Sequence, residues 1–161
     1  MHIYTRRSWG AGSLAGARHR IGRNSRLVVH HTASSYGATA KSTRAEEKVI
    51  LRAIQKQHRS QGWIDIGYSF VIFPSGRIYT CRGWYRVPAA AVGFNTSHIH
   101  VSLVGNFEIG HTTKAAQQTL KKFARRFRSK TGNRRPALGH HQVGATACPG
   151  KHLKPIVQKL P

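Results

Sequence analysis

The chain of 161 residues is long enough for one domain that buries most of its unfolded surface around a single core. Its 27 lysine and arginine residues stand against only four acidic residues, for a formal net charge of +23, which disfavours a glycosidase that works through a pair of carboxylates. The positive field favours an anionic partner, such as nucleic acid, lipopolysaccharide, a wall polymer or an anionic membrane surface, and charge alone does not choose among them.

The first 26 residues are rich in arginine, glycine and serine and show little periodicity. We expect a basic arm at about residues 1–26, either solvated or in contact with a polyanion, with Trp9 docked onto the domain. The segment Met1–Arg7 lacks the apolar run of a secretory signal, so we expect synthesis in the cytoplasm and action on a wall only after release. No stretch approaches the roughly 18 apolar residues of a membrane span.

Two elements follow the basic arm. The β-branched run at residues 27–31 predicts a buried strand. Thr43 and Glu46 have the spacing of a capping box, which predicts the start of an amphipathic helix that runs to about Arg59. The apolar stripe of this helix is expected to contain Val49, Ile50, Ala53, Ile54 and Gln57.

The middle of the chain has the pattern of three strands. Residues 68–73 and 77–82 predict a hairpin joined by a tight turn at residues 74–76. An irregular loop at residues 83–97 leads to a further strand at residues 98–105.

A second long helix is expected to begin at Thr112 or Thr113, and a short last helix at Pro149. The apolar side of the long helix contains Ala116, Leu120, Phe123, Ala124 and Phe127, and its basic outer side contains Lys121, Lys122, Arg125, Arg126 and Arg128. There is no internal repeat and no clear strand–helix–strand rhythm. We therefore predict a mixed α/β fold, in which one central mixed sheet is flanked by helices, as a single domain over residues 1–161.

The segment at residues 139–150 places two histidines and a cysteine within a dozen residues. Neutral imidazole and thiolate are ligands that zinc prefers, and a catalytic zinc takes three protein ligands and leaves one position for water. The pair His30 and His31 at the end of the first predicted strand offers the third ligand. Because successive side chains of a strand point to opposite faces, only one histidine of that pair, and one of His140 and His141, is expected to enter the site. Residue chemistry leaves the choice within each pair open.

The remaining candidate ligands receive less specific interpretations. A disulfide between Cys81 and Cys148 is one interpretation. Synthesis in the cytoplasm favours a metal-binding or free-thiol role for these cysteines instead. The other histidines are interpreted as ordinary core or surface residues; they are His2, His19, His58, His98, His100, His111 and His152.

Several sequence blocks occur in the same order as in the zinc N-acetylmuramoyl-L-alanine amidases of type 2. This group includes the T7-lysozyme-like phage endolysins and the peptidoglycan recognition proteins. The blocks are VVHHTA at residues 28–33, DIGYSF at 65–70, GFN at 93–95, VGNF at 104–107, GHH at 139–141 and ACPG at 147–150. The resemblance extends from about Arg7 to Leu160, nearly the whole chain.

The resemblance implies a zinc site that cleaves the amide between N-acetylmuramic acid and L-alanine in peptidoglycan. The family's first ligand, the first histidine of the pair after the strand, matches His30. Its second ligand lies eight residues before the cysteine and matches His140, and its third matches Cys148. The family's catalytic tyrosine matches Tyr68, so the resemblance favours Zn²⁺ held by His30, His140 and Cys148.

The chain departs from the family pattern at two places. Thr146 stands where phage members carry a lysine, and recognition proteins with amidase activity also tend to have threonine there. Its hydroxyl can donate a hydrogen bond to a developing oxyanion but adds no charge. The loop before Gly93 usually contains a histidine, and here Ala89–Ala91 replaces it.

We therefore expect a zinc-dependent amidase, of the phage endolysin kind that causes host lysis, that acts on peptidoglycan as a monomer. The basic surface is expected to contact anionic envelope polymers such as lipopolysaccharide. One alternative is a module that binds peptidoglycan without cleaving it, but such relatives typically lose the cysteine that Cys148 matches. The other is a nucleic-acid-binding protein, against which the basic residues are dispersed and no nucleic-acid-binding motif is visible.

Overall fold

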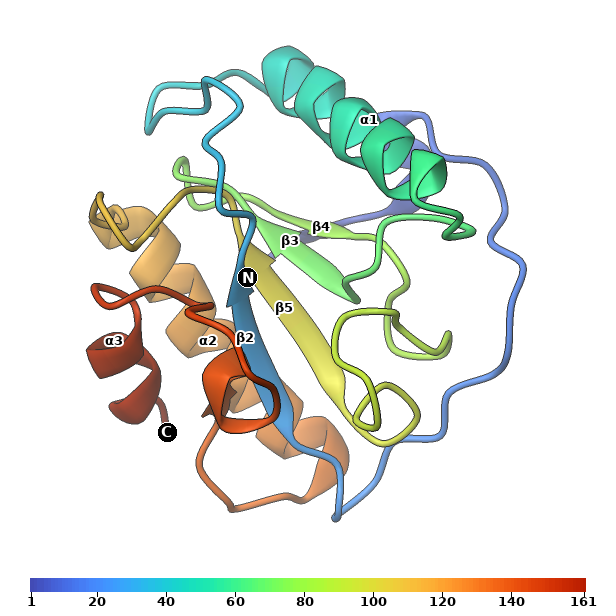
Figure 1. The fold of residues 1–161 in the computed structure, drawn as a ribbon, viewed down its shortest axis with the longest axis vertical. Helices are drawn as coiled ribbons and strands as arrows, with labels where there is room; N and C mark the ends of the chain where they lie inside the picture. Colours follow the sequence, from blue (N-terminus) through green and yellow to red (C-terminus); the bar gives the residue numbers. More distant parts are fainter.

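A mixed sheet of six strands lies at the centre of the computed structural model, which describes residues 1–161 (Figure 1). The strands are β1 (Ile3–Tyr4), β2 (Leu27–His31), β3 (Phe70–Ile72), β4 (Ile78–Thr80), β5 (Ile99–Leu103) and β6 (Leu138–Gly139), in the spatial order β1-β4-β3-β5-β2-β6. Only β3 and β4 pair antiparallel. The predicted mixed α/β fold is confirmed, although β1 and β6 were not expected from the sequence.

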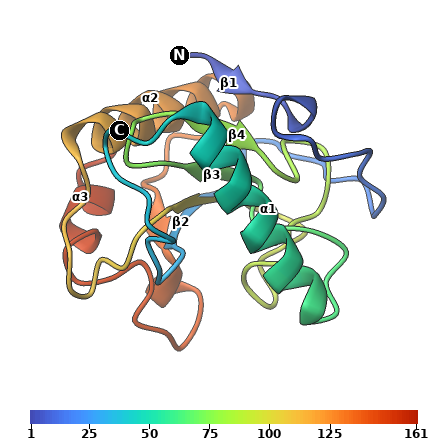
Figure 2. The same ribbon diagram turned by 90° about the horizontal axis from the view of Figure 1, so that it is seen from above.

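Helices cover both faces of the sheet (Figure 2). They are α1 (Arg44–Ser60), α2 (Lys114–Thr131) and α3 (Lys154–Gln158), with 3-10 turns at Arg6–Trp9 and His140–Gln142. One apolar cluster joins the sheet to α2 and the C-terminal segment, and a second joins the other face to α1. None of these helices combines the length and hydropathy that crossing a membrane requires.

The side chains of strand β2 alternate between the two faces of the sheet. All five of its residues are buried. Leu27 and Val29 pack in the α2 cluster, so His30, one residue further along, points to the opposite face. On β5, His100 and Ser102 pair in register with Val28 and His30. His30, His100 and Ser102 therefore lie on the same face of the sheet.

Helix α1 begins as predicted, but its buried face is rotated from the expected stripe. Thr43 Oγ1 accepts from the Glu46 amide and the Glu46 carboxylate accepts from the Thr43 amide, which completes the capping box. The buried positions are Glu47, Ile50, Leu51, Ile54, Gln55 and His58. Val49, at 69% exposure, was wrongly expected inside, as were Ala53 and Gln57. The reason is that Glu47 turns inward to an ion pair with Arg77, which a hydrophobicity pattern does not reveal.

Helix α2 follows the sequence prediction and α3 does not. Thr113 caps α2, and the apolar residues expected to face the core are buried. The last helix begins at Lys154, not at Pro149. Gly150 has φ +96°, a left-handed backbone that interrupts any helix from Pro149, and Pro155 occupies the first turn of α3 instead.

Part of the segment expected as a basic arm packs on the domain. Ile3 and Tyr4 pair with β4. Trp9 is 2% exposed and its indole N–H donates to the Thr80 carbonyl at 2.9 Å, which confirms that this side chain docks. Arg6 forms an ion pair with the buried Asp65 at 2.8 Å.

Candidate metal centre

Strand register brings the first two candidate ligands together. Val29 of β2 pairs with Gly139 of β6 in parallel orientation. His30 follows Val29 and His140 follows Gly139, and the ring centroids of the two histidines lie 4.4 Å apart. Their meeting is therefore a consequence of sheet pairing between segments that are far apart in the sequence.

A closed loop carries Cys148 back to the same place. The His141 amide donates to the Cys148 carbonyl at 2.8 Å, and the His31 amide donates to Cys148 Sγ at 3.4 Å. Gly150 allows the loop to approach the neighbouring backbone, because a Cβ there would lie 2.4 Å from the carbonyl carbon of Phe107. The thiol is thus fixed at the carboxyl end of β2.

The three ligand atoms are arranged as a zinc site needs. One ligand atom each of His30, His140 and Cys148 lies within 4.8 Å of the others. Cys148 Sγ is 3.8 Å from His30 Nδ1. Zinc bond lengths and a tetrahedral angle place a sulfur and a nitrogen ligand about 3.6 Å apart, so this pair fits.

The candidate ligands His30 and Cys148 are both neutral in the absence of a metal. Burial, and next the neighbouring His100 and His140, lower the pKa of His30 well below its ordinary value. Burial raises the pKa of the Cys148 thiol to about 11. A bound cation would therefore find imidazole lone pairs available and would displace one proton from the thiol.

The partner histidine of each pair lies outside the group of three. His31 Nδ1 accepts a hydrogen bond from the Phe107 amide at 3.2 Å, on the face opposite His30. This opposition is the one that strand alternation predicts. His141 lies on the 3-10 turn after β6 and does not join the candidate ligands.

Tyr68 and Thr146 both lie beside the group. The Tyr68 ring centroid is 5.3 Å from that of His30, and burial raises the Tyr68 pKa, so its hydroxyl stays protonated and available as a donor. Thr146 is exposed, and its Oγ1 accepts from the Cys148 amide at 3.2 Å. Thr146 therefore also supports the backbone of the cysteine.

Sequence reasoning missed His100, which lies directly behind His30. His30 Nε2 is 2.8 Å from His100 Nδ1, and His100 Nε2 is 3.2 Å from the Phe94 carbonyl oxygen. Burial lowers the pKa of His100 to about 3, so its ring is neutral. Its place two residues before Ser102 on β5 was a usable signal only once the pairing of β5 with β2 was known.

No carboxylate belongs to the site, because each of the four acidic residues has a structural partner elsewhere. Glu46 caps α1, and Glu47 pairs with Arg77. Asp65 pairs with Arg6, and Glu108 accepts from the Lys151 amide. The candidate ligands are therefore two imidazoles and a thiol, a donor set that suits zinc better than magnesium or calcium.

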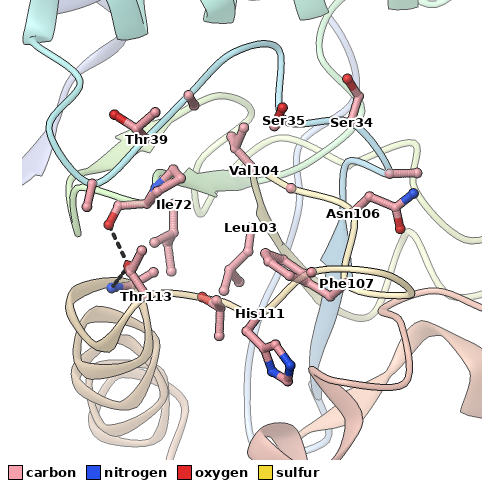
Figure 3. A pocket seen from close by; sticks show the side chains of 18 of the residues that line it. Ser34, Ser35, Thr39, Ile72, Leu103, Val104, Asn106, Phe107, His111 and Thr113 are labelled. Carbon is pink, nitrogen blue, oxygen red and sulfur yellow. Dashed lines mark hydrogen bonds between the residues drawn. The ribbon is translucent and has the colours of Figure 1, made fainter.

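Two hollows lie near the ends of the strands. A hollow of about 330 Å³ beside His140 is lined by Trp63, Ala89–Val92 and Asn95. Asn95 Oδ1 shapes its floor by accepting from the amides of Ala90 and Ala91. The larger hollow, about 480 Å³, lies between residues 33–40 and 103–113, and none of the candidate ligands lines it (Figure 3).

The known proteins that this chain resembles are named as amidases or as peptidoglycan-recognition proteins. The sequence profile described as N-acetylmuramoyl-L-alanine amidase matches residues 20–151, more than half of the chain. Peptidoglycan-recognition protein SC1a of Drosophila melanogaster is 35% identical over 161 residues, covering 95% of this chain and 82% of that protein. A Homo sapiens protein named N-acetylmuramoyl-L-alanine amidase is 36% identical over 139 residues, covering 84% of this chain and 24% of that protein.

A solved structure extends the likeness to the whole fold. Peptidoglycan recognition protein LE, in complex with tracheal cytotoxin, described as monomeric diaminopimelic acid-type peptidoglycan, superposes with a TM-score of 0.88. It is 27% identical, and the match covers 99% of this chain and 94% of that one.

Proposed function

This chain belongs to the N-acetylmuramoyl-L-alanine amidase family, and from that premise we propose that it is a zinc-dependent amidase. Its substrate in this proposal is peptidoglycan, and the bond cleaved is the amide between N-acetylmuramic acid and L-alanine. The observation that carries the proposal is the convergence of His30, His140 and Cys148 from three separate segments. The human relative's name supports the reaction, and the recognition protein solved with a peptidoglycan fragment supports the substrate class.

In the proposed mechanism, His30, His140 and Cys148 would hold the zinc ion. Zinc bound there would supply a Lewis acid that activates water near neutral pH and polarises the scissile carbonyl. The chain's own contribution is to hold the three candidate ligands together at the carboxyl end of β2, which removes the need to assemble them during the reaction.

We assign two side chains the role of stabilising the negative charge that develops on the oxygen of the scissile carbonyl. Partial burial raises the pKa of Tyr68, so its hydroxyl keeps its proton and can donate a hydrogen bond to the oxyanion of the tetrahedral intermediate. Thr146 offers a second, uncharged donor from the loop that carries Cys148. Neither group can act as a carboxylate base does, and the chain has no free carboxylate nearby.

The hollow beside His140 is assigned to the substrate. Its lining of Trp63, three alanines and Val92 is mostly apolar and uncharged, and it adjoins the ligand set directly. A glycan or peptide bound there would lie next to His140, one of the three candidate ligands.

Product analysis tests the amidase proposal. Purified peptidoglycan incubated with the zinc-loaded protein should yield stem peptides with a free L-alanine amino group, seen by mass spectrometry, and the metal-stripped protein should yield none. Adding zinc to the metal-stripped protein should restore the cleavage. Binding to peptidoglycan without any new amino group would favour a recognition module instead.

We also propose that the charge holds the enzyme at a bacterial envelope, in the manner of a phage lysis enzyme released to the wall. Exposed Lys121, Lys122, Arg125 and Arg126 form the outer side of α2, called here the α2 basic face. Anionic envelope polymers such as lipopolysaccharide are the partner that this face would attract.

Neutralising the α2 basic face tests the envelope proposal. Replacing its four residues with glutamine should lower activity on whole cells more than on soluble muramyl peptides, because only the first substrate carries the polyanion. Equal losses on both substrates would contradict the proposal. Deletion of the N-terminal segment is a poor test, because Arg6 also pairs with the buried Asp65.

A further inference from the structure

A chain of hydrogen bonds runs from the backbone of a loop to the candidate ligand His30. The Phe94 carbonyl oxygen lies 3.2 Å from His100 Nε2, and His100 Nδ1 lies 2.8 Å from His30 Nε2. We call Phe94 carbonyl, His100 and His30 the histidine relay. His100 is 0% and His30 1% exposed, so water does not compete for these bonds.

The chemistry of the groups fixes the direction of both bonds. A carbonyl oxygen only accepts, so His100 Nε2 must carry its proton. A neutral imidazole has a single N–H, which leaves His100 Nδ1 as an acceptor. His30 therefore donates from Nε2, and its own Nδ1 has a free lone pair.

That lone pair points to the place where the ligands meet. His30 Nδ1 is the atom that lies 3.8 Å from Cys148 Sγ. The opposite tautomer of His30 would put a proton between the two atoms and would leave its Nε2 lone pair facing the lone pair of His100. The histidine relay thus favours the one tautomer that can bind a cation at this site.

We infer that His100 is a positioning residue that holds His30 in the Nε2–H tautomer and orients its Nδ1 toward the metal. The inference rests on the proposed zinc site. Metal-binding histidines ordinarily donate their second N–H to a carboxylate, a backbone carbonyl or water. Here all four carboxylates have other partners. The imidazole of His100 supplies the acceptor instead, and its own orientation is fixed by the hydrogen bond to the Phe94 carbonyl.

Strand register explains why His100 can serve His30. His100 pairs with Val28 and Ser102 pairs with His30, so His100 is the diagonal neighbour of His30 on the same face of the sheet. Diagonal neighbours lie within reach of long side chains. An aliphatic residue at position 100 would fill the space without providing an acceptor.

Zinc affinity in matched variants tests the inference. Competition with a chromophoric chelator should show a dissociation constant about 10–100-fold higher for His100→Leu than for the unsubstituted protein, which is the usual effect of losing such a partner. His100→Asn should recover most of the affinity, because its Oδ1 can occupy the place of Nδ1. His19→Asn is the control, since His19 is a buried histidine whose ring forms no hydrogen bond to Phe94, His100 or His30.

Nitrogen-15 spectra of the imidazoles provide a readout that a merely structural role would not move. In the metal-free protein His30 should show a protonated Nε2 and a bare Nδ1, and His100→Leu should convert it to a mixture of tautomers. The spectrum of the unsubstituted protein needs no variant, so a proton on His30 Nδ1 would refute the inference even where His100→Leu fails to fold.

Two results would overturn the inference. One is a proton on His30 Nδ1 in the metal-free protein, and the other is unchanged zinc affinity in folded His100→Leu. A different result, no zinc binding by the unsubstituted protein, would refute the proposed zinc site itself, so the two failures are distinguishable.

Discussion

Two buried polar clusters lie on the same molecule and differ in what their polar atoms face. Under α1, the Glu47 carboxylate accepts from Arg77 Nε at 2.6 Å and from the Tyr79 hydroxyl at 2.7 Å. At the carboxyl end of β2, His30 Nδ1 and Cys148 Sγ lie 3.8 Å apart, and both groups are neutral. In the first cluster the charged and polar groups pair with one another, whereas in the second one ligand atom each of His30, His140 and Cys148 lies within 4.8 Å of the others.

The difference separates a structural network from a binding site. A buried charge must be paired and hydrogen-bonded, and Glu47 is, so this cluster has nothing left to offer a ligand. The candidate metal centre is built from neutral groups, which tolerate burial until a cation arrives. We therefore expect substitutions in the first cluster to change stability and those in the second to change function.

The largest effect is expected from removing the thiol ligand. Cys148→Ser should lower amidase turnover to background, because a serine hydroxyl is a far weaker zinc ligand than a thiolate. The melting temperature of the metal-free protein should change little. Turnover of purified peptidoglycan and a thermal scan check both halves, and full activity in the variant would remove the thiol from the mechanism.

The counterpart in the other cluster is Glu47→Gln. It leaves Arg77 without its charge partner. Because the Arg77 side chain is 28% exposed and water can solvate it, we expect a loss of about 1.5–3 kcal/mol of unfolding free energy, less than for a fully buried pair. Zinc affinity of the folded variant should match that of the unsubstituted protein. Denaturant unfolding and chelator competition measure the two quantities, and a variant that loses zinc but keeps its stability would reverse the comparison.

Tyr68→Phe should fold normally and turn over slowly. Removing one donor to a developing oxyanion costs about 10²–10³-fold in kcat. Zinc affinity should be retained, since the hydroxyl is not a ligand in this account. Steady-state kinetics with a soluble muramyl peptide would show the loss, and an unchanged kcat would exclude Tyr68 from oxyanion stabilisation.

The smallest effect is a change in pH dependence at His58, which accepts from the Gly67 amide at 3.0 Å. Burial, and next Arg82, lower the pKa of His58 from 6.5 to about 4. Between these values the unfolded chain takes up a proton that the folded chain refuses, so stability falls as pH falls.

His58→Asn should therefore flatten the decline of the melting temperature between pH 6.5 and pH 4. The matched control is His2→Asn at an exposed position, which should leave the slope unchanged. Equal slopes in all three proteins would show that His58 is not neutral in the fold.

The sequence predicted local structure better than it predicted what crosses the sheet. The capping box at Thr43, the strand at residues 27–31 and the burial of Trp9 follow from short-range patterns, and all are confirmed. The inward turn of Glu47 depends on Arg77, thirty residues away, so no periodicity in α1 could reveal it. The start of α3 was missed because a left-handed Gly150 interrupts the chain there.

The candidate site, too, could be predicted from the sequence only in part. The family resemblance picked His30, His140 and Cys148, and the parallel pairing of β2 with β6 explains why two of them meet. His100 had no motif of its own and was interpreted as an ordinary histidine. Its contact with His30 exists only because β5 pairs with β2, which composition and spacing do not specify.

Cobalt titration of the metal-free protein tests most directly whether the three side chains share one catalytic ion. We expect one Co²⁺ to bind per chain and to give a thiolate-to-metal charge-transfer band. The band should be absent in Cys148→Ser, and amide cleavage should appear in step with it. Cleavage by the metal-free protein, or a cobalt spectrum without a thiolate band, would contradict the account.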